Sequence, residues 1–215
     1  QLYEDPTIIA VASSLIDDKT RVSKEPVIGP VRLSPIQDWF FKCFRGPIAY
    51  FNQSVLLNCN DRIDIEKLSA VLEHMQTQHD TLRMQYLLLP DGSYQQVCQP
   101  IDLPVTIEVV EFDNDRDDAI LVEMNRLQSS IDLQSGPLLK VLLIRTRQSD
   151  QLFVVAHHLV VDGVSWRLLL EELEALYSTL AIDGGELPAV FRSDTYKDWT
   201  DWLYQFSQSN DVSSV

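Results

Sequence analysis

Residues 151–166 read QLFVVAHHLVVDGVSW. The first six, QLFVVA, are rich in the aliphatic and aromatic residues that occupy the buried strands of a sheet. From Val164 to Leu180 the apolar residues recur at helical spacing. Between these segments, Asp162 and Gly163 permit a tight corner. The stretch therefore predicts a strand, a corner and a helix, with two adjacent histidines where the strand ends.

The segments on either side predict further strands. The aliphatic run LLKVLLIRT (138–146) is of the kind found in the buried middle of a sheet. TLRMQYLLL (81–89) and SYQQVC (93–98) flank Pro90-Asp91-Gly92, which is a turn signal and predicts a hairpin. FNQSVLLNC (51–59) and VTIEVVEF (105–112) are also of β type.

Helical patterns alternate with these strands. After Ser34 as a cap and Pro35 as the first residue, the sequence predicts a core-facing helix. Asp64 can cap another helix, and residues 114–130 and 196–206 predict two more. The apolar faces expected for the first three are Ile36, Trp39, Phe40 and Cys43; Ile65, Leu68, Val71, Leu72 and Met75; and Ile120, Leu121, Met124 and Leu127. This alternation predicts a mixed α/β layer structure.

Composition excludes several classes of protein. With 45% hydrophobic residues in 215, the chain can bury one substantial core. Its 17 Lys and Arg against 32 Asp and Glu give a formal charge of −15, which disfavours nucleic acid and anionic membrane surfaces as partners. Three cysteines without a C-x-x-C pair argue against a disulfide framework or a zinc knuckle. No apolar run approaches the ~18 residues of a membrane span, so a cytoplasmic protein is expected.

The two histidines permit two interpretations. In an extended chain the side chains of His157 and His158 point to opposite faces, so only one can line a cleft. The helix that begins near Val164 would direct backbone N–H groups toward such a cleft. This arrangement suits a general base beside a site that stabilises negative charge on a carbonyl oxygen. Alternatively, both histidines are hydrogen-bonded core residues and Asp162 only caps the helix.

Other chemistries fit the sequence less well. Adjacent histidines on opposite faces do not chelate one metal easily, and no carboxylate-rich partner is near, so no metal site is predicted. Ser165 lacks the second glycine of a nucleophile elbow. His74 and His79 are expected to face solvent. Gly184-Gly185 ends a helix and precedes no other, so it does not predict a phosphate loop.

Three segments resemble motifs of one family, in the family's order. His157 to Gly163 resembles the HHxxxDG motif of nonribosomal peptide synthetase condensation-type domains. LSPIQDWFF (33–41) and QHDTLRMQY (78–86) resemble its opening motif and its H-[DE]-x-L-R segment. Within that family the epimerization branch is indicated, because Gln37 and Trp39 fall in its PIQxWF signature. Ser165 and Trp166 complete its HHxxxDxxSW form.

The resemblance implies a fold and a domain order. Residues 31–208 would form the N-terminal lobe of an epimerization domain, with a mixed sheet flanked by helices as in chloramphenicol acetyltransferase. Residues 1–17 would be the last helix of a peptidyl carrier protein, 18–30 a linker and 209–215 a tail. The partners would be that upstream carrier in cis and a second, C-terminal lobe that supplies a catalytic glutamate.

The resemblance also assigns roles to residues. His158 would be the catalytic histidine, with His157, Asp162 and Gly163 structural and Arg83 in an ion pair with Asp162. The implied reaction removes and returns the α-proton of an aminoacyl or peptidyl thioester carried on phosphopantetheine, with no cofactor bound directly. Two alternatives stay open: a condensation domain that forms peptide bonds, and a non-catalytic lobe that docks the carrier.

Overall fold

The computed structural model describes residues 25–101, 105–113, 117–182, 185–190 and 194–208. The predicted carrier helix and the predicted tail therefore lie outside the described residues, as does most of the predicted linker. The domain boundaries stay a prediction.

A four-stranded mixed sheet forms the centre of the fold. It contains β2 (Asn52–Cys59), β5 (Ile107–Glu111), β6 (Leu139–Arg145) and β7 (Asp150–His157), in the order β2-β7-β6-β5. β7 runs antiparallel to β2 and to β6, whereas β5 runs parallel to β6. The aliphatic residues in the middle of β6 and β7 are buried, as their sequence predicted.

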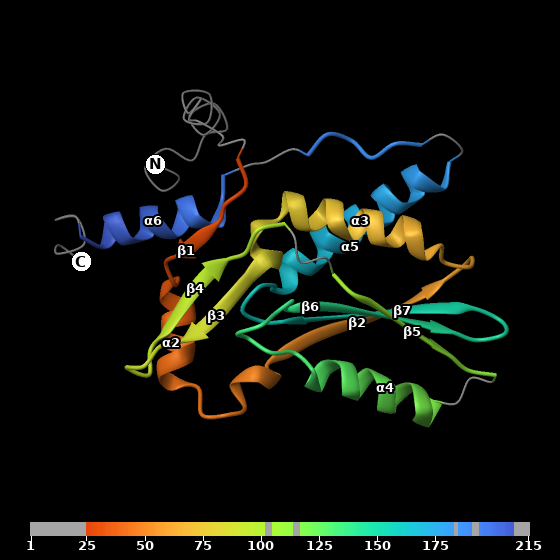
Figure 1. Ribbon diagram of the computed structural model, residues 1–215, viewed down its shortest axis with the longest axis horizontal. Helices are drawn as coiled ribbons and strands as arrows, with labels where there is room; N and C mark the ends of the chain where they lie inside the picture. Colours follow the sequence, from red (N-terminus) through yellow and green to blue (C-terminus); the bar gives the residue numbers. More distant parts are fainter. Residues whose placement is uncertain (1–24, 102–104, 114–116, 183–184, 191–193, 209–215) are drawn as a thin grey trace, which may run out of the picture.

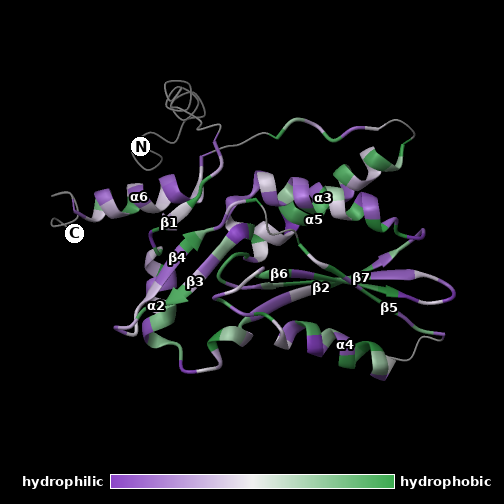
Figure 2. Cartoon of the chain, in the orientation of Figure 1, coloured by the Kyte–Doolittle hydropathy of each residue, from purple (hydrophilic) through white to green (hydrophobic). Residues whose placement is uncertain are grey.

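Helices cover both faces of this sheet. α3 (Ile65–Gln78) and α5 (Gly163–Ala181) lie together on one face, and α4 (Asp117–Ser129) lies on the other (Figure 1). Hydrophobic and hydrophilic segments alternate along α4, as expected for a helix with one face on a sheet (Figure 2). One residue of its predicted apolar face differs, because Leu121 is 53% exposed. The predicted mixed α/β fold with helices flanking a sheet is confirmed.

A second, three-stranded sheet lies beside the first. It has the order β1-β4-β3, with β1 (Gly29–Val31) and β3 (Met84–Leu88) both antiparallel to β4 (Tyr94–Cys98). β3 and β4 form the predicted hairpin. β1 includes the last two residues of the predicted linker, because its backbone pairs with that of β4.

The helix α2 (Pro35–Cys43) begins as predicted but presents a different face to the core. The Ser34 side chain caps it and forms a capping box with Gln37. Of the predicted core face, Phe40 is buried, but Ile36 and Trp39 are 66% and 58% exposed and Cys43 is exposed. Gln37 is buried instead. The expectation was wrong because the buried Gln37 amide finds hydrogen-bond partners in the core, so this polar side chain is accommodated there.

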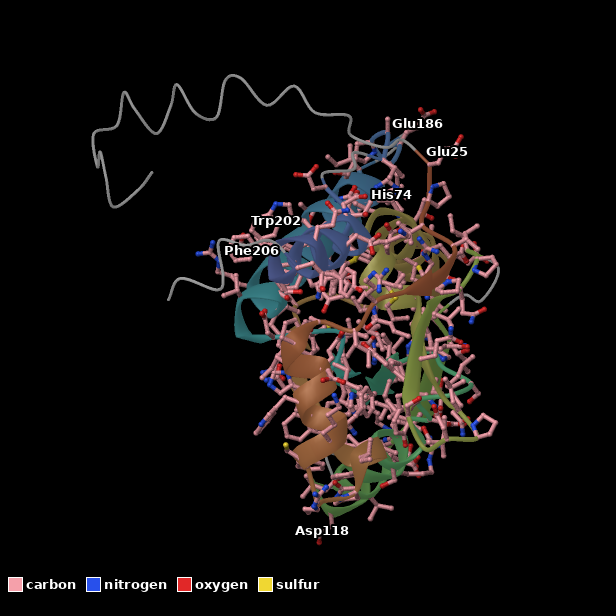
Figure 3. The ribbon with its side chains drawn as sticks, turned by 90° about the vertical axis from the view of Figure 1, so that its left-hand side faces the viewer. Glu25, His74, Asp118, Glu186, Trp202 and Phe206 are labelled. Atoms are coloured by element: carbon pink, nitrogen blue, oxygen red, sulfur yellow. The ribbon has the colours of Figure 1, made fainter. Side chains whose placement is uncertain are left out.

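The helix α6 (Tyr196–Ser207) lies against the chain that follows β1. Arg32 bonds Asp201 at 3.1 Å and lies 4.0 Å from the centre of the Tyr204 ring. Trp202 and Phe206 stack on each other on the outer side of this helix, away from the sheets (Figure 3). Within the described ranges, no helix has the length and apolar content needed to cross a membrane.

Candidate functional site

His157 is the last residue of β7 and belongs to the core. Its side chain is fully buried. The ring nitrogen Nε2 lies 2.8 Å from the carbonyl oxygen of Ile48, and Nδ1 accepts a hydrogen bond from the backbone N–H of Leu159 at 3.1 Å. Because a carbonyl only accepts and an N–H only donates, Nε2 carries the proton. Burial lowers the pKa of this histidine below its ordinary value.

His158 points the opposite way and lines a cleft. Its backbone N–H donates to the carbonyl oxygen of Phe51 at 2.8 Å, and its ring stacks on the Phe51 ring with a centroid separation of 5.2 Å. The side chain is half-buried. The structure therefore agrees with the expectation that one histidine is packed and the other faces a cavity.

The cleft has a volume of about 800 Å³ and a largely apolar wall with several aromatic side chains. It lies between α2, the corner that precedes α5, and the start of α6. Besides His158, the side chains that give it this character are Ile36, Trp39, Phe40, Phe44, Phe51 and Trp199. Such a wall suits an apolar or amphiphilic ligand that brings a reacting group to the imidazole.

The start of α5 also lines the cleft. Asp162 caps this helix, and its Oδ1 accepts from the backbone N–H and from the hydroxyl of Ser165, both at 2.7 Å. These two bonds lower the pKa of the Asp162 carboxyl, and the nearby His158 acts in the same direction. Asp162 and Ser165 both line the cleft. The Ser165 hydroxyl is therefore part of the cap of α5, because it donates to the carboxylate that caps this helix.

Gly163 is the first residue of α5 and has an ordinary backbone conformation there. Its φ is not positive, and a methyl group built on it would meet no atom within 4 Å. The corner therefore does not need a glycine for its backbone. The open space beside this residue adjoins the cleft residues Asp162 and Ser165.

The expected ion pair between Arg83 and Asp162 is wrong. Arg83 pairs instead with Asp80, three residues earlier, and both side chains are buried. The guanidinium also donates to the carbonyl oxygens of Gln76, Val27 and Gln99. These acceptors hold the guanidinium within the core, whereas Asp162 caps α5 at the surface.

The three motif segments, 33–41, 78–86 and 157–163, are joined by buried hydrogen bonds. The Gln37 amide donates to the Tyr86 hydroxyl at 2.9 Å and to the Leu159 carbonyl at 3.2 Å. The Tyr86 hydroxyl donates to the same carbonyl at 3.1 Å. Burial raises the pKa of Tyr86 well above its ordinary value, so the phenol stays neutral. The opening motif, the segment that ends at Tyr86 and the histidine motif are thus joined by side chains.

The sequence matches a model of a known protein family. Residues 27–214 match the family model described as Condensation domain. The chain belongs to the condensation domain family. This is the family that the order of the motifs in the sequence indicated.

Relatives in the condensation domain family include bacterial peptide synthases. The chain is 37% identical over 216 residues to surfactin synthase subunit 2 of Bacillus subtilis, covering 97% of this chain and 6% of that protein. It is 34% identical over 212 residues to gramicidin S synthase 1 of Brevibacillus brevis, covering 97% of this chain and 19% of that protein. The chain thus spans a small part of these relatives.

Solved structures of condensation-type domains have the same fold. The epimerization domain from the third module of tyrocidine synthetase B is 34% identical, with a TM-score of 0.82 over 88% of this chain and 44% of that chain. The first condensation domain of the calcium-dependent antibiotic synthetase is 21% identical, with a TM-score of 0.68 over 84% of this chain and 44% of that chain. The chain spans less than half of each of these structures.

The remaining sequence candidates are distributed unequally around the site. Trp39 and Gln37 line the cleft, and Trp166 is buried behind His158. His79, expected to face solvent, instead forms a partly buried contact with the Glu172 carboxylate. Across the described ranges, no group of three or more His, Cys, Asp or Glu side chains could hold a metal ion.

Residues that sequence reasoning missed come from segments without a recognisable signature. Gln53 in β2 contacts the His158 ring, Phe51 stacks on it, and Trp199 of α6 lines the cleft. Gln53 looks like any polar residue of a strand. The only available signal was the β-type run at 51–59, which identified the strand but not its neighbour.

Proposed function

We propose that the chain is the N-terminal lobe of an epimerization domain of a nonribosomal peptide synthetase. It would convert an L-aminoacyl or peptidyl thioester to the D-epimer. The position of the His158 ring on the cleft carries this proposal, because a base must reach the α-carbon of its substrate. The greater similarity to the tyrocidine synthetase epimerization domain than to the calcium-dependent antibiotic condensation domain supports the choice of branch.

The proposed reaction divides into two proton transfers. His158 takes the proton from the α-carbon, so the C–H bond breaks, an N–H bond forms and the electron pair passes to the thioester oxygen as an enolate. A proton delivered to the opposite face then forms the new C–H bond and restores the thioester. Backbone N–H groups at the start of α5 would stabilise negative charge on that oxygen, in competition with the Asp162 carboxylate that caps this helix. A glutamate of the second lobe would supply the other proton.

The substrate would arrive on the phosphopantetheine arm of an upstream carrier protein in cis, in the cytoplasm, and no cofactor would bind the lobe itself. An extended arm with an apolar amino acid at its end fits a cleft with a largely apolar wall. The second lobe would close the exposed side of this cleft, where Ile36 and Trp39 are open to solvent. This expectation is consistent with the chain spanning 44% of the tyrocidine synthetase domain.

The first test compares the synthetase that carries this sequence with its His158→Ala variant. A loaded L-aminoacyl carrier is incubated with each, and the chirality of the released residue is determined. The parent should form the D-residue, and His158→Ala should lose at least about 100-fold in rate, the usual contribution of a positioned acid or base. His74→Gln, on α3 and outside the cleft, is the control and should keep its rate.

The same assay separates the alternatives. A peptide-bond-forming condensation domain, favoured by the shared fold of the antibiotic synthetase domain, would extend the peptide and retain the L-configuration. A non-catalytic docking lobe would leave D-residue formation unchanged in His158→Ala. Either result would overturn the proposal.

A second test uses the 215-residue chain alone, in excess over a carrier-bound L-aminoacyl thioester in D₂O. One lobe should not exchange the α-proton, because it neither encloses the substrate nor supplies the second acid. Exchange that disappears in His158→Ala would show that this lobe suffices for proton abstraction and would contradict the two-lobe account.

A further inference from the structure

Behind His158, two side chains that the family motifs do not connect form a chain of hydrogen bonds. The indole Nε1–H of Trp166 donates to Oε1 of Gln53 at 2.9 Å. The amide Nε2 of the same Gln53 lies 3.0 Å from Nε2 of His158. Gln53 is on β2 and Trp166 is on α5, so these hydrogen bonds join the sheet to the helix that begins beside the cleft.

The direction of each hydrogen bond follows from which atoms of the three side chains can donate and which can accept. An indole N–H can only donate, so the Gln53 oxygen must face Trp166 and its NH₂ group must face the histidine. An NH₂ group can only donate, so Nε2 of His158 must accept and carries no proton. The orientation of the Gln53 amide follows from its partners rather than from the appearance of its atoms.

The other side of the imidazole leads to the same tautomer independently. Nδ1 of His158 lies 2.8 Å from the carbonyl oxygen of Val161, which accepts only, so Nδ1 carries the proton. The adjacent His157 has the opposite assignment, with its proton on Nε2. Two neighbouring histidines are therefore held in opposite tautomers by different partners.

We propose that Gln53, oriented by Trp166, is a positioning residue that holds His158 with a proton on Nδ1 and a lone pair on Nε2. Its value for catalysis rests on the proposed function, in which Nε2 takes the α-proton. The imidazole has one lone pair in the ring plane, so the substrate C–H must displace the Gln53 amide to reach it. Once Nε2 is protonated it can no longer accept from the Gln53 NH₂ group.

Gln53 is an uncharged hydrogen-bond partner of the His158 ring. Phe51 covers one ring face, and the neighbouring titratable groups are His157 on β7 and Asp162 at the start of α5. Neither is hydrogen-bonded to Nε2 in the structure. A change at Gln53 should therefore act on the protonation of His158 directly.

The experiment is ¹⁵N NMR of the 215-residue chain labelled at its four histidines. At pH 8, His158 should show a protonated Nδ1 and an unprotonated Nε2, and His157 the reverse. In Gln53→Glu, one carboxylate can accept from both Trp166 and a protonated Nε2. The ratio of doubly protonated to neutral His158 should then rise about tenfold or more at a given pH, as expected for a hydrogen bond to a charged group.

Asn58→Asp is the matched control, because it adds the same charge to the other end of β2 and keeps an acceptor for Gln151. It should leave the His158 signals unchanged, and the His157 signals should be the same in all variants. If Gln53→Glu does not fold, Trp166→Phe takes its place. That variant frees the Gln53 amide to rotate, so the Nε2 signal of His158 should shift as its hydrogen bond weakens, while the Val161 carbonyl keeps the proton on Nδ1.

A proton on Nε2 of His158 in the parent would overturn the proposal. Equal spectra for Gln53→Glu and Asn58→Asp, or unchanged His158 signals in Trp166→Phe, would do so too. Because the spectra report the tautomer without turnover, they are independent of whether the full synthetase epimerizes its substrate.

Discussion

Arg83 and Asp80 form a buried ion pair within a single 3-10 turn, the segment Asp80–Arg83 between α3 and β3. Three other N–H groups of the guanidinium donate to carbonyl oxygens at the end of α3, before β1 and after β4. This arginine therefore joins the second sheet to α3, and it contributes to the stability of the fold rather than to the cleft.

The first prediction concerns this pair. Arg83→Met should destabilise the protein by ~3–5 kcal/mol in urea unfolding, because it leaves the Asp80 carboxylate buried without its cation. Combined with Asp80→Asn, the cost should be clearly less than the sum of the two single changes. Combined with Asp162→Ala, it should equal the sum, since the two sites share no contact. Coupling to Asp162 and additivity with Asp80 would reverse the assignment made from the structure.

The second prediction concerns the cap of α5. Asp162→Ala should cost about 1 kcal/mol at pH 7, the usual loss for an N-cap, whereas Asp162→Asn should cost less because asparagine also caps. The folded state lowers the pKa of this carboxyl below 3.8, so its ionised form stabilises the fold above that pH. The stability difference between parent and Asp162→Ala should shrink as the pH falls below 3.8. A difference that is constant down to pH 2 would contradict this.

The third prediction concerns His157. Burial holds its pKa below the ordinary value of 6.5, so the unfolded chain binds a proton more readily than the folded one. Its contribution to stability is therefore complete above pH 6.5 and declines as the pH falls through that value. His157→Gln keeps a donor for the Ile48 carbonyl but does not titrate. Urea unfolding at pH 7.5 and pH 5.0 should show a smaller acid-dependent loss in this variant, and an equal loss would exclude His157 as the cause.

The fourth prediction concerns the space beside Gly163. Gly163→Ala should leave stability unchanged or raise it by ~0.4–1 kcal/mol, because the backbone already has a conformation that alanine adopts. If the thioester passes this open space, D-residue formation should fall at the same time. Gly92→Ala is the contrasting control, since its φ of +83° makes it costly at the hairpin turn without affecting the cleft. Undiminished turnover in Gly163→Ala would place the substrate elsewhere.

Local features of this chain were predictable from its sequence. Ser34 and Asp64 cap helices as expected, because a cap bonds residues two or three positions away. Asp162 caps α5, as one of the two interpretations of its motif proposed. The runs at 138–146 and 151–156 gave the buried centre of the sheet, since an aliphatic strand must be covered on both faces. The adjacency of His157 and His158 required that one be packed when the other lines a cavity.

What the sequence could not supply is the identity of partners that are distant along the chain. Periodicity predicted that α2 buries Ile36 and Trp39, but the core partners of Gln37 turned a different face inward. The contact between Gln53 and His158 joins residues 105 positions apart. Arg83 pairs with Asp80, three residues away, and not with Asp162. Hydrophobic spacing reports the preference of one element for burial, whereas the pairing of polar groups depends on which elements meet, and only the tertiary structure decides that.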